Sequence, residues 1–279
     1  MTAEQSVLLH RSGRLARVTL NRPARRNSFD LAMLARFEDV LHELGRDRDI
    51  EVVVLTGEGT AFCAGTDLRE LAELGRDRDI EVVVLTGEGT AFCAGTDLRE
   101  LAGLDAETTM YVQRRTAELV ERWYRLEQTT VAAFNGPAIG SGAVLGLASD
   151  LRVAADSAFF TFPEVTFGIP LTWSGMAILA DLVGADLAKR WLLLGERVEP
   201  ADMLALRLVT RVVDADGLPA AVTGITDRLL ATSAVGRSMT KRAARLAGPR
   251  FDAVANDSYL GALSVALRPL GDYLDRGAR

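Results

Sequence analysis

The chain contains few of the residue types that most often build metal sites, disulfides and nucleophilic triads. Its 279 residues include two cysteines and two histidines. His10 and His42 stand near neither a serine motif nor a cluster of metal-ligand residues, so we expect no metal site and no serine–histidine triad. Because Cys63 and Cys93 occupy the same place in two identical stretches, we expect no disulfide framework, which fits a reducing, cytoplasmic location.

The sequence also lacks an excess of positive charge, a long apolar run and a leader segment. Its formal net charge of −6 gives no reason to expect a nucleic-acid partner. No run of about twenty apolar residues predicts a membrane span, and residues 1–14 lack the basic start and apolar core of a signal peptide. The remaining composition, 48% hydrophobic and 25% charged, is typical of a globular protein that can bury a sizeable core.

The most unusual positive feature is an identical repeat of thirty residues. Residues 43–72 read ELGRDRDIEVVVLTGEGTAFCAGTDLRELA, and residues 73–102 read the same letters again. Structural repeats normally drift in sequence, so two identical copies do not indicate a solenoid. They indicate a recent duplication, natural or engineered, or an artefact of the gene sequence. Because each copy contains a candidate catalytic loop, the chain has two candidates for one position.

The hydrophobic pattern predicts an α/β fold with a helical C-terminal part. Strands and helices are expected to alternate as far as about residue 200, after which the pattern is helical and more charged. Strands are predicted at residues 7–9, 16–20, 51–57, 81–87, 130–134 and 151–155, and helices at residues 28–44, 112–126, 143–148 and 176–194.

Two kinds of loop combine small residues with the start of a helix. One is residues 63–67, copied as 93–97, and the other is residues 140–142. Small side chains let a ligand approach the backbone closely, and helix N-termini present N–H groups with a positive dipole end. Glycines that permit tight turns explain either loop alone. The two loops together are more specific, because two N–H groups aimed at one oxygen form an oxyanion hole.

Glu164 is the candidate acid–base residue. A glutamate after a proline is ordinarily a solvated turn residue. Here it lies among apolar residues, namely Phe159, Phe160, Phe162, Val165 and Phe167. Burial in such surroundings raises the pKa of a carboxyl group and suits it to moving protons.

Taken together, the motifs resemble those of the crotonase, or enoyl-CoA hydratase/isomerase, superfamily. They fall in family order and cover nearly the whole chain outside the repeat. The matching stretches are residues 18–23 with 26–28, 53–57 with 61–68, 135–138 with 140–142, 149–150, 162–164, and 208–209 with 211–213.

The resemblance implies a fold, a substrate and a site. The fold would be a spiral core of ββα turns in residues 1–200, followed by a helical region in residues 201–279 that builds homotrimers, often paired into hexamers. The substrate would be an acyl-CoA thioester, with coenzyme A as part of the substrate and no separate cofactor. Its carbonyl oxygen would accept hydrogen bonds from the backbone N–H groups of Ala64, or its copy Ala94, and of Ser141.

One departure from the family pattern favours a particular reaction. Hydratases of the family carry a second glutamate at the position of Val144, where it helps to activate water, which valine cannot do. The Δ3,Δ2-enoyl-CoA isomerases keep only the glutamate at the position of Glu164. We therefore expect an enoyl-CoA isomerase in which Glu164 takes a proton from C2 and returns it at C4. The alternatives are a hydratase or lyase that recruits another carboxylate, and an acyl-CoA-binding or assembly subunit whose site the repeat has impaired.

The resemblance also implies contacts to the substrate or its coenzyme A. These are expected at Arg26, Asp67, Leu68, Gly140 and Trp173. For Trp173, a place in the core or in a trimer contact is as good an interpretation as a place in the acyl pocket.

The cost of closing the extra loop slightly favours the first copy as the working one. With the first copy in the core, the longer connection costs about 1.2 kcal/mol, and with the second copy about 1.9 kcal/mol. We therefore expect Ala64 to act with Ser141, and residues 73–102 to form an excursion near the acyl pocket or on the surface. The alternative is that the repeat adds a turn to the spiral and places the second copy beside Ser141.

Overall fold

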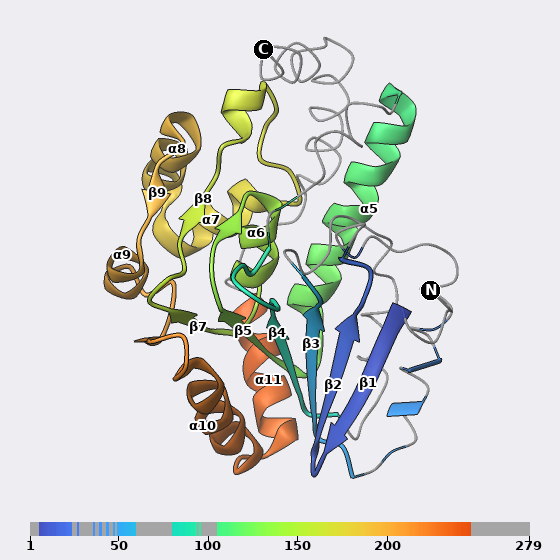
Figure 1. Ribbon diagram of the computed structural model, residues 1–279. Helices are drawn as coiled ribbons and strands as arrows, with labels where there is room; N and C mark the ends of the chain where they lie inside the picture. Colours follow the sequence, from blue (N-terminus) through green and yellow to red (C-terminus); the bar gives the residue numbers. More distant parts are fainter. Residues whose placement is uncertain are drawn as a thin grey trace.

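The computed structural model describes residues 6–23, 27, 36, 39–40, 43–44, 47, 49–59, 80–93, 95 and 105–246 (Figure 1). In these residues, seven strands form one sheet in the order β1-β2-β3-β4-β5-β7-β10. β1 and β2 are antiparallel, and every later neighbour in the sheet is parallel. A smaller sheet has the order β6-β8-β9.

The strands and helices have the following bounds. The large sheet contains β1 (Val7–Ser12), β2 (Leu15–Leu20), β3 (Val52–Gly57), β4 (Val82–Thr86), β5 (Thr129–Phe134), β7 (Leu151–Ala155) and β10 (Val212–Val213). The small sheet contains β6 (Ala138–Ile139), β8 (Phe160–Thr161) and β9 (Arg197–Val198). The helices are α5 (Ala106–Arg125), α6 (Ser141–Leu147), the 3-10 helix η2 (Glu164–Phe167), α7 (Gly175–Val183), α8 (Ala185–Leu194), α9 (Pro200–Ala205), α10 (Leu218–Leu230) and α11 (Ala234–Arg245).

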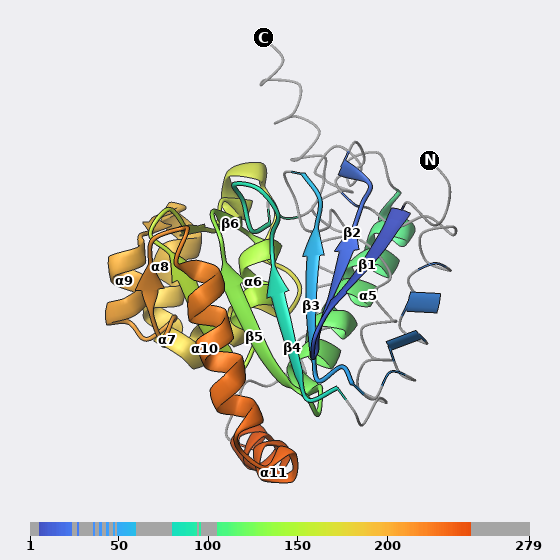
Figure 2. The same ribbon diagram turned by 60° about the horizontal axis from the view of Figure 1, so that its bottom comes forward.

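The central strands β3 and β4 are buried on both faces of the large sheet, which explains their uninterrupted apolar runs. Successive side chains of a strand point to opposite faces. In β3, Val53 and Leu55 belong to the hydrophobic cluster that also contains Trp123 of α5, whereas Val52 and Val54 belong to the cluster that contains Leu218 of α10. Figure 2 shows α10 on one side of the sheet and α5 on the other.

Both copies of the repeat contribute a strand to this sheet. β3 comes from the first copy and β4 from the second, and they pair in parallel with Val52 opposite Val82 and Leu55 opposite Leu85. The expectation that residues 73–102 form an excursion is therefore wrong for their strand, which pairs with β3 on one side and with β5 on the other. The strand of the second copy is instead an added strand next to β5, which agrees with the alternative that the repeat adds a turn to the spiral.

Burial of the second strand explains why the loop-closure estimate failed. The four apolar residues of β4, Val82 to Leu85, are at most 1% exposed. Burying one valine or leucine stabilises the fold by about 1.5–3 kcal/mol. That gain exceeds the difference of about 0.7 kcal/mol between the two loop closures, so an arrangement that buries both strands is favoured.

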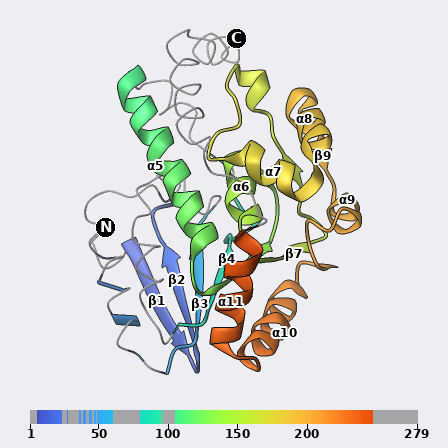
Figure 3. The same cartoon turned by 180° about the vertical axis from the view of Figure 1, so that it is seen from behind.

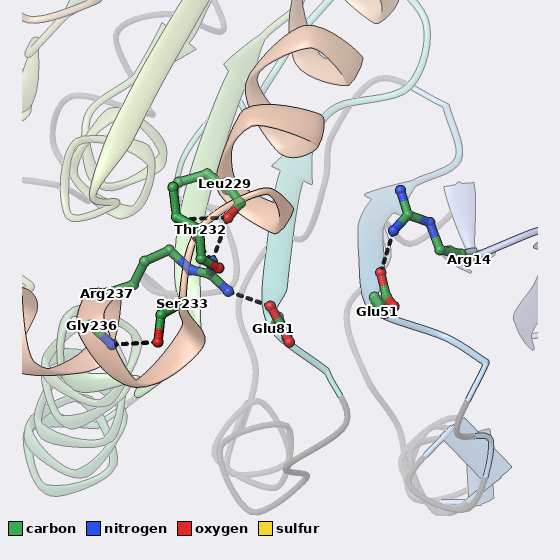
Figure 4. Close-up of polar contacts among 8 residues, drawn as sticks. All are labelled: Arg14, Glu51, Glu81, Leu229, Thr232, Ser233, Gly236 and Arg237. Carbon is green, nitrogen blue, oxygen red and sulfur yellow. Dashed lines mark hydrogen bonds and ion pairs between the residues drawn. The ribbon is translucent and has the colours of Figure 1, made fainter.

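The same glutamate has a different partner in each copy. Glu51, just before β3, accepts a hydrogen bond of 2.7 Å from Arg14 in the turn between β1 and β2. Glu81, just before β4, forms an ion pair with Arg237 of α11 (Figure 4). The position of a copy in the sheet, and not its sequence, therefore decides what it contacts.

Two predicted helices differ from the observed ones. The expected helix over residues 176–194 is two helices, α7 and α8, because Gly184 between them adopts φ 82°, which interrupts helical geometry. The expected helix over residues 112–126 starts earlier, at Ala106, where Asp105 caps it by accepting a hydrogen bond of 2.7 Å from the Thr108 N–H.

The last described helix, α11, is anchored to the start of β5 and the end of α6. Lys241, only 8% exposed, places Nζ 2.5 Å from the Asp150 carboxylate and donates a hydrogen bond to the Gln128 carbonyl. Seen from behind, α11 lies beside α10, below α5 and α6 (Figure 3). Among the described helices, none is long and apolar enough to cross a membrane.

Candidate active site

The loop that follows β4 meets the segment between β5 and α6. Cys93 pairs with Ala138 in a parallel bridge, and the Ile139 N–H donates a hydrogen bond of 2.9 Å to the Cys93 carbonyl. Phe92 donates a hydrogen bond of 3.0 Å from its N–H to the Pro137 carbonyl. The second copy therefore lies beside the segment that leads into α6.

The two loops lie in contact through small residues. A Cβ atom added at Gly95 would lie 2.8 Å from the Ile139 carbonyl oxygen, and one added at Gly142 would lie 2.7 Å from the Cys93 sulfur. Larger side chains at these glycines would push the loops apart. Ala94, between Cys93 and Gly95, and its counterpart Ala64 in the first copy lie outside the described residues.

Ser141 is the first residue of α6, and the residue before it has a conformation that favours glycine. Gly140 adopts φ 55° and ψ −126°, and its N–H donates a hydrogen bond of 2.8 Å to the Thr161 carbonyl. α6 is buried along its whole length. N–H groups of a first helical turn point out of the N-terminal end, which here lies next to Gly95 and Glu164.

Glu164 opens η2 and places its carboxylate against Gly140. A Cβ atom added at Gly140 would lie 2.0 Å from Oε1 of Glu164. Oε2 is buried, with no hydrogen-bond partner among the residues that the structure describes. This burial raises the pKa of Glu164 from 4.5 to about 7. Glu164 as a whole is half-buried, and the burial expected for it is observed at its carboxyl group, which is suited to exchanging a proton near neutral pH.

The contact between Gly140 and Glu164 leads to a prediction. Gly140→Ala should lower kcat about tenfold or more, because the added methyl group must displace the Glu164 carboxylate. Gly184→Ala is the matched control: Gly184 also has positive φ, but a Cβ atom there meets nothing within 4 Å. Steady-state kinetics and thermal unfolding of both variants check this. Equal kcat values in the two variants would contradict it.

Val144, where hydratases carry the second glutamate, is in apolar surroundings. It is fully buried in α6, and a Cβ atom added at Gly175 would lie 2.8 Å from its Cγ2 and 2.6 Å from Leu171 Cδ2. Val144 and Leu171 belong to the same hydrophobic core cluster. Trp173 is buried in the same hydrophobic cluster, which is one of the places considered for it.

The remaining predicted ligand contacts cannot be placed. Arg26, Asp67 and Leu68 lie outside the described residues. Within the described part of the chain, no three histidine, cysteine, aspartate or glutamate side chains gather so that they could hold a metal ion.

Sequence reasoning treated Asn135 only as the end of a strand, and the structure gives its side chain a further role. Its Oδ1 accepts a hydrogen bond of 3.0 Å from the Gly87 N–H, and its Nδ2 donates to the carbonyls of Gly89 and Ala91, at 3.1 and 3.2 Å. The signal that could have shown this is an asparagine directly before a glycine at a strand end, since such asparagines often bond to backbone groups.

The sequence is similar to those of known proteins. A family model described as "Enoyl-CoA hydratase/isomerase" matches residues 10–77 and 71–249. A probable enoyl-CoA hydratase of Mycobacterium leprae is 33% identical over 257 residues, covering 90% of this chain and 77% of the relative. A short-chain-enoyl-CoA hydratase of Clostridium acetobutylicum is 29% identical over 243 residues, covering 85% and 80%.

Solved structures show the same fold. An enoyl-CoA hydratase from Mycobacterium avium subsp. paratuberculosis superposes with a TM-score of 0.71 at 24% identity, covering 96% of this chain and 97% of the other. A monofunctional enoyl-CoA isomerase from M. smegmatis superposes with a TM-score of 0.55 at 28% identity, covering 85% and 91%. The chain thus resembles proteins named for both reactions.

Proposed function

Because the chain belongs to the enoyl-CoA hydratase/isomerase family and is an enzyme of the crotonase superfamily, we propose that it is a Δ3,Δ2-enoyl-CoA isomerase. One observation carries this choice: a glutamate with a buried carboxyl oxygen stands at the base position, and fully buried Val144 occupies the position of the second glutamate. Adding water requires a group that activates the water, whereas moving a double bond requires a single base.

In this mechanism Glu164 transfers one proton in two steps. The carboxylate of Glu164 takes a proton from C2 of the 3-enoyl thioester, and the electrons of that C–H bond form an enolate with the carbonyl. Glu164 then returns the proton to C4, which leaves the double bond between C2 and C3. A pKa of about 7 allows the same group to accept the proton and to release it.

The enolate oxygen is stabilised by two backbone N–H groups, those of Ser141 and Ala94. Cys93 and Gly95, which flank Ala94, both lie against the segment that leads into α6. This supports Ala94 over Ala64, because β3, the strand of the first copy, is separated from β5 by β4. Preorganised donors of this kind stabilise the charge that develops on a thioester oxygen.

We further propose the assembly and the contacts that the resemblance implies. Residues 201–279 build a homotrimer or a hexamer of two trimers in the cytoplasm, after a spiral core in residues 1–200. The acyl-CoA substrate contacts Arg26, Asp67, Leu68, Gly140 and Trp173, and coenzyme A enters only as part of the substrate. The two identical copies are the product of a duplication of residues 43–72.

The alternative within the family is a hydratase or lyase, and the names of the relatives favour it. Relatives of this chain include proteins named probable enoyl-CoA hydratase and short-chain-enoyl-CoA hydratase. A hydratase here would need a second carboxylate from another position, since Val144 cannot supply it.

Assaying 3-enoyl-CoA and 2-enoyl-CoA side by side tests the proposal. An isomerase converts the 3-enoyl thioester to the 2-enoyl thioester and forms little 3-hydroxyacyl-CoA from the latter. Rapid formation of 3-hydroxyacyl-CoA would show that the protein is a hydratase and not an isomerase. Binding of acyl-CoA without any turnover would show that the protein is a catalytically impaired binding subunit.

A further inference from the structure

The backbone between Gly87 and Ala91 is held by one side chain from the neighbouring strand. Asn135, at the end of β5, makes three hydrogen bonds to this loop, one as acceptor and two as donor. The loop continues directly into Cys93, whose N–H donates to the Pro137 carbonyl at 3.3 Å. Asn135 therefore holds the start of the segment that carries Ala94.

The loop packs closely against Asn135 and Gly136. A Cβ atom added at Gly87 would lie 2.7 Å from Oδ1 of Asn135 and 2.1 Å from the Ala91 carbonyl. One added at Gly136 would lie 2.1 Å from the Thr90 carbonyl. With no spare room here, a shift of the Asn135 side chain moves the loop itself.

A second asparagine makes a comparable contact with the first copy, one strand further along the sheet. Asn27, after β2, accepts a hydrogen bond of 2.7 Å from the Arg22 N–H and donates one of 2.8 Å to the Glu58 carbonyl. Residues 57–61 and 87–91 are identical in sequence. Asn135 therefore bonds to this sequence beside the site, whereas Asn27 bonds to Glu58 of the first copy, one strand further away.

We propose that Asn135 is a positioning residue that fixes the second copy's loop from Gly87 to Cys93 and thereby supports the oxyanion-hole donor proposed for that copy. This rests on the proposed function. Asn135 acts through the backbone of Gly87, Gly89 and Ala91, and Cys93 in turn pairs with Ala138 of β6.

If Asn135 has this role, its replacement should lower kcat more than it weakens substrate binding. Charge on the thioester oxygen is greatest in the enolate-like transition state, so an oxyanion-hole donor that points away weakens the transition state more than the bound substrate. A residue that only stabilised the fold would change the melting temperature without changing kcat per folded molecule.

A pair of chemically equivalent variants tests the proposal. Asn135→Asp keeps the acceptor for the Gly87 N–H but sets a carboxylate oxygen against two carbonyls, and Asn27→Asp does the same to its contact with Glu58. We expect Asn135→Asp to lower kcat at saturating thioester about tenfold or more, and Asn27→Asp to change it less than about twofold. Equal kcat values in the two variants would overturn the proposal.

A second readout applies if the wild-type protein turns over no enoyl thioester, which would be a failure of the proposed function alone. Cys93 is 4% exposed, so in a Cys63→Ser background its reaction with a thiol reagent reports how firmly the loop is held. Faster labelling in Asn135→Asp than in Asn27→Asp supports the positioning role, and equal rates overturn it.

Discussion

Replacing Glu164 by glutamine should lower kcat about a hundredfold or more while thioester binding persists, because the amide keeps the shape of the side chain but cannot accept the C2 proton. The wild-type rate should fall as the pH drops below about 7, where the pKa of Glu164 lies, since protonation removes the base. The variant's residual rate should not show this dependence. Stopped-flow or coupled assays across pH 5–9, with calorimetric binding of a thioester analogue, measure both.

The stability of the same variant serves as its control. In the folded protein Glu164 holds its proton up to about pH 7, whereas its unperturbed pKa is 4.5. Because the folded state binds more protons between these values, folding stability contributed by this group decreases as the pH rises through that window. Glutamine removes this penalty, so Glu164→Gln should melt no lower than the wild type at pH 8. Unchanged turnover in this folded variant would remove Glu164 from the mechanism.

Proline at position 94 should abolish most of the activity, whereas proline at position 64 should leave it largely intact. Proline has no backbone N–H, so Ala94→Pro removes one oxyanion-hole donor, a loss of about a hundredfold to a thousandfold in kcat. Ala64→Pro makes the same change in the same local sequence, one strand further from β5. Steady-state kinetics on both variants, with circular dichroism to confirm folding, is the measurement.

The outcomes of this pair separate the two copies. Loss of activity in Ala64→Pro alone would show that the first copy supplies the oxyanion-hole donor. Loss in neither would mean that the copies exchange, each able to occupy the place beside β5. Deleting one copy cannot make this distinction, because removing residues 43–72 or residues 73–102 leaves the same sequence.

The strands of the sheet were predictable because their patterns are strong and local. The runs before Gly57 and Gly87 each have four apolar residues in succession, and a strand buried on both faces is the arrangement that such a run favours. The break at Gly184 was missed because the apolar pattern continues across it. A glycine in a helical pattern often costs stability without ending the helix, and the positive φ that ends α7 is visible only in the structure.

The order of the two copies could not be read from local sequence. Identical residues have identical propensities, so the choice depends on contacts made by other parts of the chain. Arg14 reaches the glutamate of one copy and Arg237 that of the other (Figure 4). These partners are distant in the sequence. An estimate based on loop length alone does not include them.

The environment of Glu164 was predictable in kind but not in detail. Its phenylalanine neighbours in the sequence indicated burial, and the raised pKa follows from that burial. The close approach of its carboxylate to Gly140 depends on the left-handed turn before α6. The periodicity of a sequence indicates which residues share a face of one helix or strand. It does not give the distance between residues in two separate loops.

The in-register pairing of β3 with β4 also affects how the chain folds. A shift of pairing by one whole repeat puts an identical residue at each place in the strand, so a shorter sheet can form with either copy between β2 and β5. Such states expose the apolar residues of the excluded copy, which disfavours them at equilibrium, yet they are kinetic traps of nearly equal local energy. Refolding should therefore contain a slow phase that a chain with a single copy lacks.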